Sequence, residues 1–383
     1  MLNRRTLRIK AMQSLFAYEQ CKVANYHLAL EQIATAFMPD LNSMEKQDKS
    51  LLKVQSHEAT VLFKKNYKKN DKKNIEGTSE KVTNEVNKAI KKYYEQLEKD
   101  NKFLKREMLK DAEQIYDRYS WLLCWLNNMV ALLGGLKPKG GAPTYTNLIN
   151  NRLIKLIQEH QKLSTIFIKS GLTWEQEKEE LLVWIKEVFL KDDVIVEYLN
   201  QETTTFKDDS ELVLHIYKAG IFKSEIIGLF MEQADLYWSE NKAILRSMVL
   251  KTIKGIEEDN PDFELAELSY NWEEDREFFE IIFDQTIGES EKYEALISTK
   301  TENWDIDRIS DTDRILLQMA IQEMINFPAI PLKVTINEYI EVSKKYSTPK
   351  SKQFINGVLD VIAVDLQEKG TIKKSGRGLI DNK

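Results

Sequence analysis

The chain has 383 residues, of which 42% are hydrophobic and 30% charged, and its formal net charge at pH 7 is −6. This composition is typical of a soluble globular protein, and the length favours two or three domains. No apolar run approaches the ~20 residues that a membrane-spanning helix needs, and the basic first residues lack the apolar stretch of a secretory signal. We expect Cys21 and Cys124 to be buried free thiols in a reducing cytoplasm, because they are far apart and lie in apolar contexts.

The chain contains few residues that interrupt helices. Only 14 glycines and 7 prolines occur, and long stretches rich in Leu, Ile, Lys and Glu separate them. There is no series of alternating strands joined by Asn-Gly or Asp-Gly turns, as a sheet would require. The sequence therefore predicts an all-α fold.

The N-terminal segment combines an apolar stripe with a basic start. Apolar residues recur at helical spacing over residues 1–25, which predicts one helix there. Three arginines, Arg4, Arg5 and Arg8, lie in the first turns of this helix and cluster on one side of it.

Residues 26–256 are predicted to form a divergent, mostly helical region. A lysine-rich run at 64–73 holds six lysines and one acid, and is either a solvated loop or a nucleic-acid contact. A strongly apolar helix is predicted at 111–133, followed by a Gly/Pro-rich linker at 134–143. Further helices are predicted at 145–167, 174–189, 209–218, 222–238 and 239–256.

The last part of the chain changes character after Pro261. Residues 257–367 are predicted to form a compact helical subdomain of four helices, and residues 368–383 a flexible tail. The segment TINEYIEVSKKYSTPKSKQFINGVLDVI (335–362) reads as two helices joined by a turn. Thr335 and Glu338 fit a capping box at the start of the first helix.

The second helix of this hairpin is expected to begin with Thr348 as its N-cap and Pro349 in its first turn. Asn356 and Gly357 lie in its interior, where both residue types are unfavourable. One interpretation is structural: Gly357 allows another helix to approach closely, and Asn356 is a buried polar anchor that must find hydrogen-bond partners.

Catalytic and cofactor-binding patterns are absent. The four histidines, His27, His57, His160 and His215, do not fall in zinc-ligand spacing, and no Cys-x-x-Cys occurs. Neither a P-loop nor a Gly-x-Gly-x-x-Gly loop is present. We therefore predict no catalytic residue, no cofactor and no metal, and expect that the chain is not an enzyme.

Three collinear segments resemble the transcription antitermination factor NusB family. They are KVTINEYIEVSKKYSTPKSKQFINGVLD (333–360), DRISDTDRILLQMAIQEMI (307–325) and NRRTLRIKAMQSLFAYEQ (3–20). In the first segment, Asn337, Glu338, Asn356 and Gly357 carry the signature. The resemblance covers residues 1–25 and about 270–365, and implies a NusB-like helical bundle with a large, mostly helical insertion at 26–256.

The resemblance implies an RNA-binding adaptor that acts with ribosomal protein S10 on the boxA sequence of ribosomal RNA transcripts and helps RNA polymerase pass terminators. Guanidinium groups pair with phosphates and stack on unpaired bases. Arg4, Arg5 and Arg8 are therefore candidate RNA contacts, and the alternative is that they are ordinary solvated charges at a helix start.

The start of the last helix is expected to extend this basic surface. Lys350, Lys352 and Gln353 supply polar groups there, and Phe354 is either a stacking face or a core residue. An acidic chain can still bind RNA through one basic face, because the local field decides binding.

The resemblance places Phe16 and Glu323 on the surface that faces S10. Phe16 is equally consistent with a core aromatic residue. Glu323 lies in an otherwise apolar helix, where a carboxylate needs solvent or a cationic partner.

Two other functions remain open. One is a helical interaction protein in ribosomal RNA maturation or ribosome assembly without antitermination activity. The other is the NusB-like domain of a ribosomal RNA methyltransferase, which would require a downstream α/β domain with a glycine-rich loop, whereas the family signature here ends close to the last residue.

Overall fold

The computed structural model describes residues 1–42, 44, 46–68, 78–136, 144–171, 173–301 and 309–382. Within these ranges every regular element is a helix, so the predicted all-α fold is confirmed. No helix in the described part of the chain is long and apolar enough to cross a membrane. The chain divides into two compact units: residues 4–109 with 276–383, which we call the arginine unit, and residues 1–3 with 110–275, which we call the tryptophan unit.

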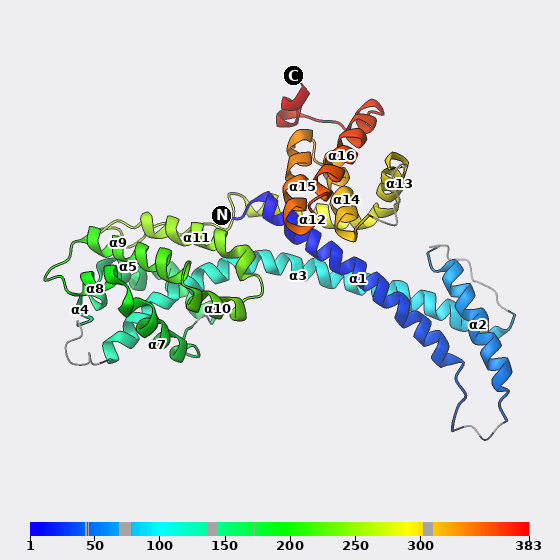
Figure 1. Cartoon of the computed structure of the whole chain (residues 1–383), viewed down its shortest axis with the longest axis horizontal. Helices are drawn as coiled ribbons and strands as arrows, with labels where there is room; N and C mark the ends of the chain where they lie inside the picture. The colour runs from blue at the N-terminus through cyan, green and yellow to red at the C-terminus, as the bar shows by residue number, and fades with distance from the viewer. Residues whose placement is uncertain are drawn as a thin grey trace. The chain divides into compact units, whose positions relative to one another are not determined.

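The arginine unit is built around one central helix, α14 (Asp311–Asn326) (Figure 1). Buried side chains run from Ile315 to Met324 without a gap, so α14 has no solvent-facing stripe in this stretch. Four other helices of the unit pack most extensively against it. They are α1 (Arg4–Ala36), α13 (Ser290–Lys300), α15 (Leu332–Tyr346) and α16 (Ser351–Glu368).

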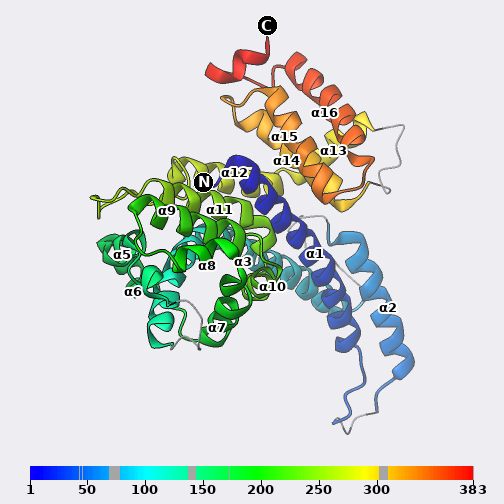
Figure 2. The same ribbon diagram turned by 60° about the vertical axis from the view of Figure 1, so that its left-hand side comes forward.

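The first helix is longer than the predicted 1–25, since α1 continues to Ala36. Its second half packs beside α2 (Lys49–Asn66) (Figure 2). One apolar cluster joins this half to α2 and the beginning of α3 (Glu80–Gly135). Its buried members are Ala29, Ile33, Phe37, Ala59, Phe63, Val82, Val86 and Ala89. Residues 26–109 thus belong to the same unit as the C-terminal helices, and the predicted insertion is divided between the two units.

The tryptophan unit contains the rest of the predicted insertion. Its core is aromatic: the Trp121 and Trp174 rings stack with centroids 3.7 Å apart, and Trp125 stacks on Phe189 at 5.5 Å. The Trp174 indole donates a hydrogen bond to the Trp121 carbonyl oxygen at 3.0 Å. Its other elements are α4 (Thr146–Ile149), α5 (Arg152–Glu159), α6 (Gln161–Ser170), α7 (Lys178–Glu187), η1 (Phe189–Lys191), α8 (Asp193–Leu199), α9 (Phe206–His215), the π-helix η2 (Ile216–Ile221), α10 (Glu225–Ala234) and α11 (Trp238–Lys254).

The single helix predicted at 145–167 is three short helices, α4, α5 and α6. Two side chains explain the interruptions. Asn151 Oδ1 accepts from the Ile154 amide at 3.0 Å, and His160 Nδ1 accepts from the Leu163 amide at 3.2 Å. Each side chain caps the helix that follows it and so starts a new helix. The predicted helix at 111–133 is the end of α3, and residues 137–143 of the predicted linker lie outside the described residues.

The helix starts predicted in the C-terminal hairpin are wrong. Helix α15 begins at Leu332, so Thr335 lies inside it, and its hydroxyl donates to Glu323 Oε1 at 2.9 Å instead of forming a capping box. Helix α16 begins at Ser351, and Thr348 is not its N-cap. The Thr348 hydroxyl forms a hydrogen bond with the Ser351 hydroxyl at 2.8 Å.

The structural interpretation of Asn356 and Gly357 is also wrong, because both residues are exposed. A Cβ atom built on Gly357 meets no atom of a described neighbour within 4 Å, so none of the described helices crosses there. The Asn356 amide donates to Asp360 Oδ2 of its own helix at 3.1 Å. Helix α16 packs through its other face, which includes Ile355 and Leu359.

This exposure predicts that Gly357→Ala stabilises the protein by about 0.5–1 kcal/mol, because alanine loses less backbone freedom in a helix and has room here. Urea unfolding followed by circular dichroism measures the change. Gly220→Ala is the opposite control: its Cβ would lie 2.5 Å from Phe189 Cε1, so it should destabilise. A destabilised Gly357→Ala variant would show that a neighbour does cover this face.

Candidate nucleic-acid interface

A buried ion pair joins the first helix to the centre of the arginine unit. Arg8 Nε lies 2.7 Å from Glu323 Oε2, and Arg8 Nη2 lies 2.7 Å from Glu323 Oε1. The Arg8 side chain is 4% exposed and the Glu323 side chain 0%. This two-point geometry is the strongest form of arginine–carboxylate contact.

Two hydroxyl groups of α15 complete the surroundings of the Glu323 carboxylate. Thr335 donates to Oε1 at 2.9 Å and Tyr339 donates to Oε2 at 3.1 Å. Burial alone would disfavour the charge on Arg8, but the charge and hydrogen bonds of Glu323 outweigh it and raise the pKa of Arg8. Arg8 therefore stays charged, and the Glu323 carboxylate lies opposite that charge.

The burial of these two side chains contradicts two of the contacts predicted from the sequence. Arg8 was predicted to contact RNA and Glu323 to face a protein partner, but neither side chain is accessible to a ligand in this arrangement. Both residues instead hold α1 against α14 and α15.

Arg5 lies at the surface beside the buried pair. Its Nε and Nη2 atoms contact Glu338 Oε2 and Oε1 at 2.7 and 2.8 Å. The Arg5 side chain is 48% exposed, whereas that of Glu338 is 20% exposed. The hydrogen bonds from Arg5, with the nearby charge of Arg8, lower the pKa of Glu338. Glu338 thus fixes one edge of the Arg5 guanidinium group, and the three N–H donors that these two bonds leave over can be shared with a ligand.

Arg4 is partly buried against an aromatic residue. Its guanidinium carbon lies 4.9 Å from the centroid of the Phe278 ring, a cation–π distance. Asn337, the other polar residue of the signature in α15, is exposed next to Glu338. The accessible basic groups at the start of α1 are therefore Arg4 and Arg5.

The start of α16 is held by a buried carboxylate. Asp313 of α14 accepts hydrogen bonds from Ser347 at 2.6 Å and from Ser351 at 2.7 Å. The residues next to this anchor are exposed, namely Lys350, Lys352 and Gln353, while Phe354 is half-buried. The two hydroxyl contacts with Asp313 of α14 thus fix the position from which these side chains reach into solvent.

The arginines and the start of α16 form two patches. Arg5 pairs with Glu338, in the first half of α15, whereas Ser347 follows the other end of that helix. Ser347 lies nine positions after Glu338, a separation that corresponds to about 13 Å of helix. Only an extended ligand can contact both patches.

Phe16 is 37% exposed on α1, together with Val23 at 54% on the same face of the helix. Sequence reasoning left open whether Phe16 is a core residue, and the structure gives its ring a solvent-facing side. Phe16 is thus available to a partner.

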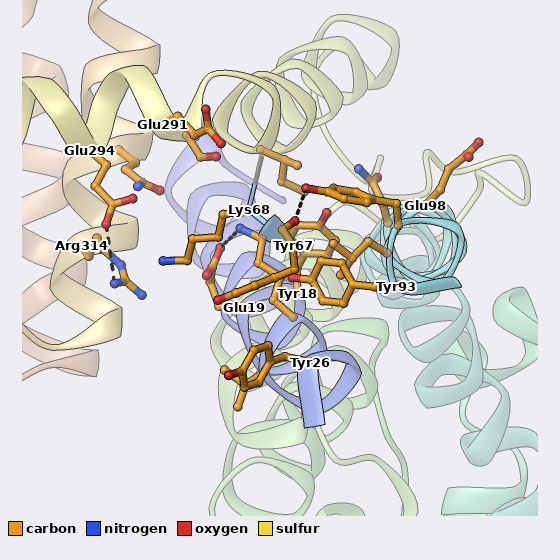
Figure 3. Close-up of a pocket in the computed structure, with 18 of the residues that line it drawn as sticks. Tyr18, Glu19, Tyr26, Tyr67, Lys68, Tyr93, Glu98, Glu291, Glu294 and Arg314 are labelled. Atoms are coloured by element: carbon orange, nitrogen blue, oxygen red, sulfur yellow. Dashed lines mark hydrogen bonds and ion pairs between the residues drawn. The ribbon is translucent and has the colours of Figure 1, made fainter. Parts of the chain in front are cut away.

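A second feature of the arginine unit is a hollow of about 830 Å³, which we call the tyrosine cleft (Figure 3). Five tyrosines line it: Tyr18, Tyr26, Tyr67, Tyr93 and Tyr94. Sequence reasoning missed this site because five separate segments contribute to it. One signal was present, since Tyr18, Lys22 and Tyr26 are spaced four residues apart on α1 and share a face. In the described residues, no group of three or more His, Cys, Asp or Glu is arranged to hold a metal ion.

Comparison with known proteins shows which family the chain is similar to. The model of the NusB family matches residues 243–364. The Transcription antitermination protein NusB of Salinibacter ruber is 40% identical over 141 residues, which cover 35% of this chain and 88% of that protein. Proteins of the same name from Chloroherpeton thalassium and Natranaerobius thermophilus are each 39% identical, over 28% and 27% of this chain and 50% and 71% of their own lengths. No solved structure matches the chain.

The buried pair predicts a large penalty for removing one partner. Arg8→Met or Glu323→Gln should destabilise the protein by about 3–5 kcal/mol, because an unpaired charge or unmatched donors remain buried. Arg5→Met is the matched control: the same substitution on the same helix breaks an exposed pair and should cost at most about 1 kcal/mol. Urea unfolding measures both, and an Arg8→Met penalty no larger than that of Arg5→Met would contradict the structural role.

Proposed function

The chain belongs to the NusB family, and from this membership we propose that it is an RNA-binding factor that acts with ribosomal protein S10 on a boxA-like sequence of ribosomal RNA transcripts. The family's general role is transcription antitermination, which the names of the three relatives state. Our proposal adds to this general role a specific RNA sequence and a specific protein partner.

The observation that carries the RNA proposal is the exposed guanidinium group of Arg5, which Glu338 fixes in place. A guanidinium group held in one orientation binds a phosphate or stacks on a base with little loss of side-chain entropy. Arg4 lies one residue away, and Lys350, Lys352 and Gln353 provide a second polar patch. Single-stranded RNA suits this arrangement, because a flexible strand can reach both patches.

Phe16 supports the proposal of a protein partner. An exposed aromatic side chain is a common anchor of protein interfaces. It lies on α1, the helix that also carries Arg5, so a protein bound at Phe16 and RNA bound at Arg5 would contact the same rigid element.

The first test is the RNA titration itself. We expect the protein to bind a boxA-like RNA more tightly than a scrambled RNA of the same composition, and S10 to increase the difference. Affinity should fall steeply with salt, because phosphate contacts release counterions. Fluorescence anisotropy of labelled RNA measures both effects, and equal affinity for the two RNAs with no effect of S10 would refute the proposal.

The second test locates the RNA surface. Lys352→Glu should weaken RNA binding and reduce the slope of log affinity against log salt by about 1, because one phosphate contact is lost. Lys373→Glu is the control, since it makes the same charge change at an exposed position that follows α16. Equal losses for the two variants would mean that only the overall charge matters.

The third test addresses the protein partner. Phe16→Ser should leave the affinity for RNA alone unchanged and abolish the increase caused by S10, because the aromatic anchor is lost. Leu28→Ser removes another exposed apolar side chain from the same helix and should have no effect. If S10 still enhances RNA binding by Phe16→Ser as strongly as by the wild type, S10 binds elsewhere.

A further inference from the structure

The tyrosine cleft lies wholly within the arginine unit but depends on helices that the family resemblance does not cover. Tyr18 and Tyr26 come from α1, Tyr67 follows α2, and Tyr93 and Tyr94 come from α3. The opposite side is formed by α13 and α14, with Glu291, Glu294 and Arg314 (Figure 3).

The aromatic side of the cleft is a continuous series of rings. The Tyr26 and Tyr67 ring centroids are 4.8 Å apart, those of Tyr67 and Tyr93 are 5.7 Å apart, and those of Tyr93 and Tyr94 are 5.3 Å apart. The Tyr94 hydroxyl donates to the Tyr67 carbonyl oxygen at 2.6 Å, which ties the end of α2 to α3. Burial and the nearby Glu19 raise the pKa of Tyr18 to about 12, so this ring stays neutral.

The polar groups of the cleft are nearly balanced in charge. Three cations line it, Lys22, Lys68 and Arg314, together with four carboxylates, Glu19, Glu98, Glu291 and Glu294. Some already pair: Lys22 Nζ lies 2.6 Å from Glu19 Oε1, and Arg314 Nη1 lies 4.0 Å from Glu294 Oε1. Asn101 and Gln318 add amide groups.

This balance selects a class of ligand. A bare polyanion or polycation would gain little from a lining whose charges nearly cancel. A nucleobase is neutral and aromatic, and its edges carry both donors and acceptors, so it can stack on tyrosine and bond with carboxylates, amides and ammonium groups. A hollow of about 830 Å³ is in the usual range for a small ligand.

We propose that the tyrosine cleft binds an unpaired base of a single RNA strand. The cleft would then be a second RNA site, supplied largely by the helices that follow the N-terminal family motif at residues 3–20. This inference rests on the proposed RNA-binding function. It adds to that function a site outside the family motifs, with Lys22, Lys68 and Arg314 as the groups that would meet the flanking phosphates.

Two adjacent residues of α14 lie between the cleft and the start of α16. Arg314 lines the cleft, and its neighbour Asp313 holds Ser351 through a 2.7 Å hydrogen bond. A strand that passes Lys350 and Lys352 would therefore come close to the cleft without crossing the buried core.

Photocrosslinking tests the location directly. The full-length protein is bound to the boxA-like RNA in which each uridine in turn is replaced by 5-iodouridine, which cross-links to aromatic rings that stack on it. After irradiation, peptide mass spectrometry identifies the modified residue. We expect cross-links to Tyr26 or Tyr67, whose rings are partly exposed, from at least one position of the RNA.

Binding measurements with matched variants test the contribution of the cleft. Tyr67→Leu should weaken RNA binding by roughly five- to 150-fold, the range for losing one base–aromatic stack, whereas Tyr67→Phe should retain binding because the ring remains. Lys68→Glu should weaken binding more than Lys65→Glu, because both residues are exposed in the same lysine-rich run but only Lys68 lines the cleft. The exposed lysine pair keeps the test valid if Tyr67→Leu fails to fold.

The outcomes separate this inference from the proposed function. If the wild type binds RNA, no cross-link falls in the cleft and all four variants bind normally, the second site is wrong and the RNA-binding function stands. If the wild type binds no RNA, the proposed function fails first. If uridine monophosphate alone binds the cleft as tightly as the RNA does, the cleft is a site for free nucleotides. If Tyr67→Leu abolishes binding of an Arg-Gly repeat peptide but leaves RNA binding unchanged, the cleft is a peptide site. Either result overturns the RNA site.

Discussion

The arrangement of the arginine unit depends on the buried ion pair between Arg8 and Glu323. The two residues are far apart in the sequence, and Thr335 and Tyr339 add hydroxyl groups from a third helix. Because a buried charge without its partner is strongly unfavourable, α1 can occupy essentially one position against α14 and α15. Arg5 lies three residues before Arg8 on the same side of α1, so the pair also determines where Arg5 meets Glu338 and solvent.

The family signature drew attention to residues that make important contacts in the structure, but it did not predict what each of them contacts. Arg4, Arg5 and Arg8 look equivalent in the sequence, since all three fit a basic face at a helix start. Only the tertiary partners distinguish them: Arg8 meets a fully buried carboxylate, Arg5 meets one that is partly exposed, and Arg4 lies against Phe278. The carboxylate of Glu323 was expected to need either solvent or a cation, and the sequence could not show that it meets a cation, Arg8.

Helix starts predicted from capping patterns were wrong where the expected capping side chain makes a hydrogen bond to another helix instead. Thr335 fits a capping box with Glu338, yet its hydroxyl binds Glu323 and the helix starts at Leu332, directly after Pro331. Helical periodicity correctly predicted an all-α chain, but of the five described helices between Trp272 and Glu368 it predicted four and missed α13. It could not reveal that α16 leaves Gly357 on its exposed face, because the apolar face and the neighbouring helices are known only once the bundle is assembled.

The length of α1 limits how RNA could use both ends of the helix. Arg5 and Tyr26 lie on this one helix, 21 residues apart, which corresponds to about 31 Å at the rise of an α-helix. A stacked strand advances about 3.4 Å per nucleotide, so a strand that reached Arg5 and the far side of the tyrosine cleft would span roughly nine stacked nucleotides. The patch at Lys350 and Lys352 is nearer the cleft, because Arg314 and Asp313 are neighbours. A short RNA would therefore join the start of α16 to the cleft before it joined either of them to Arg5.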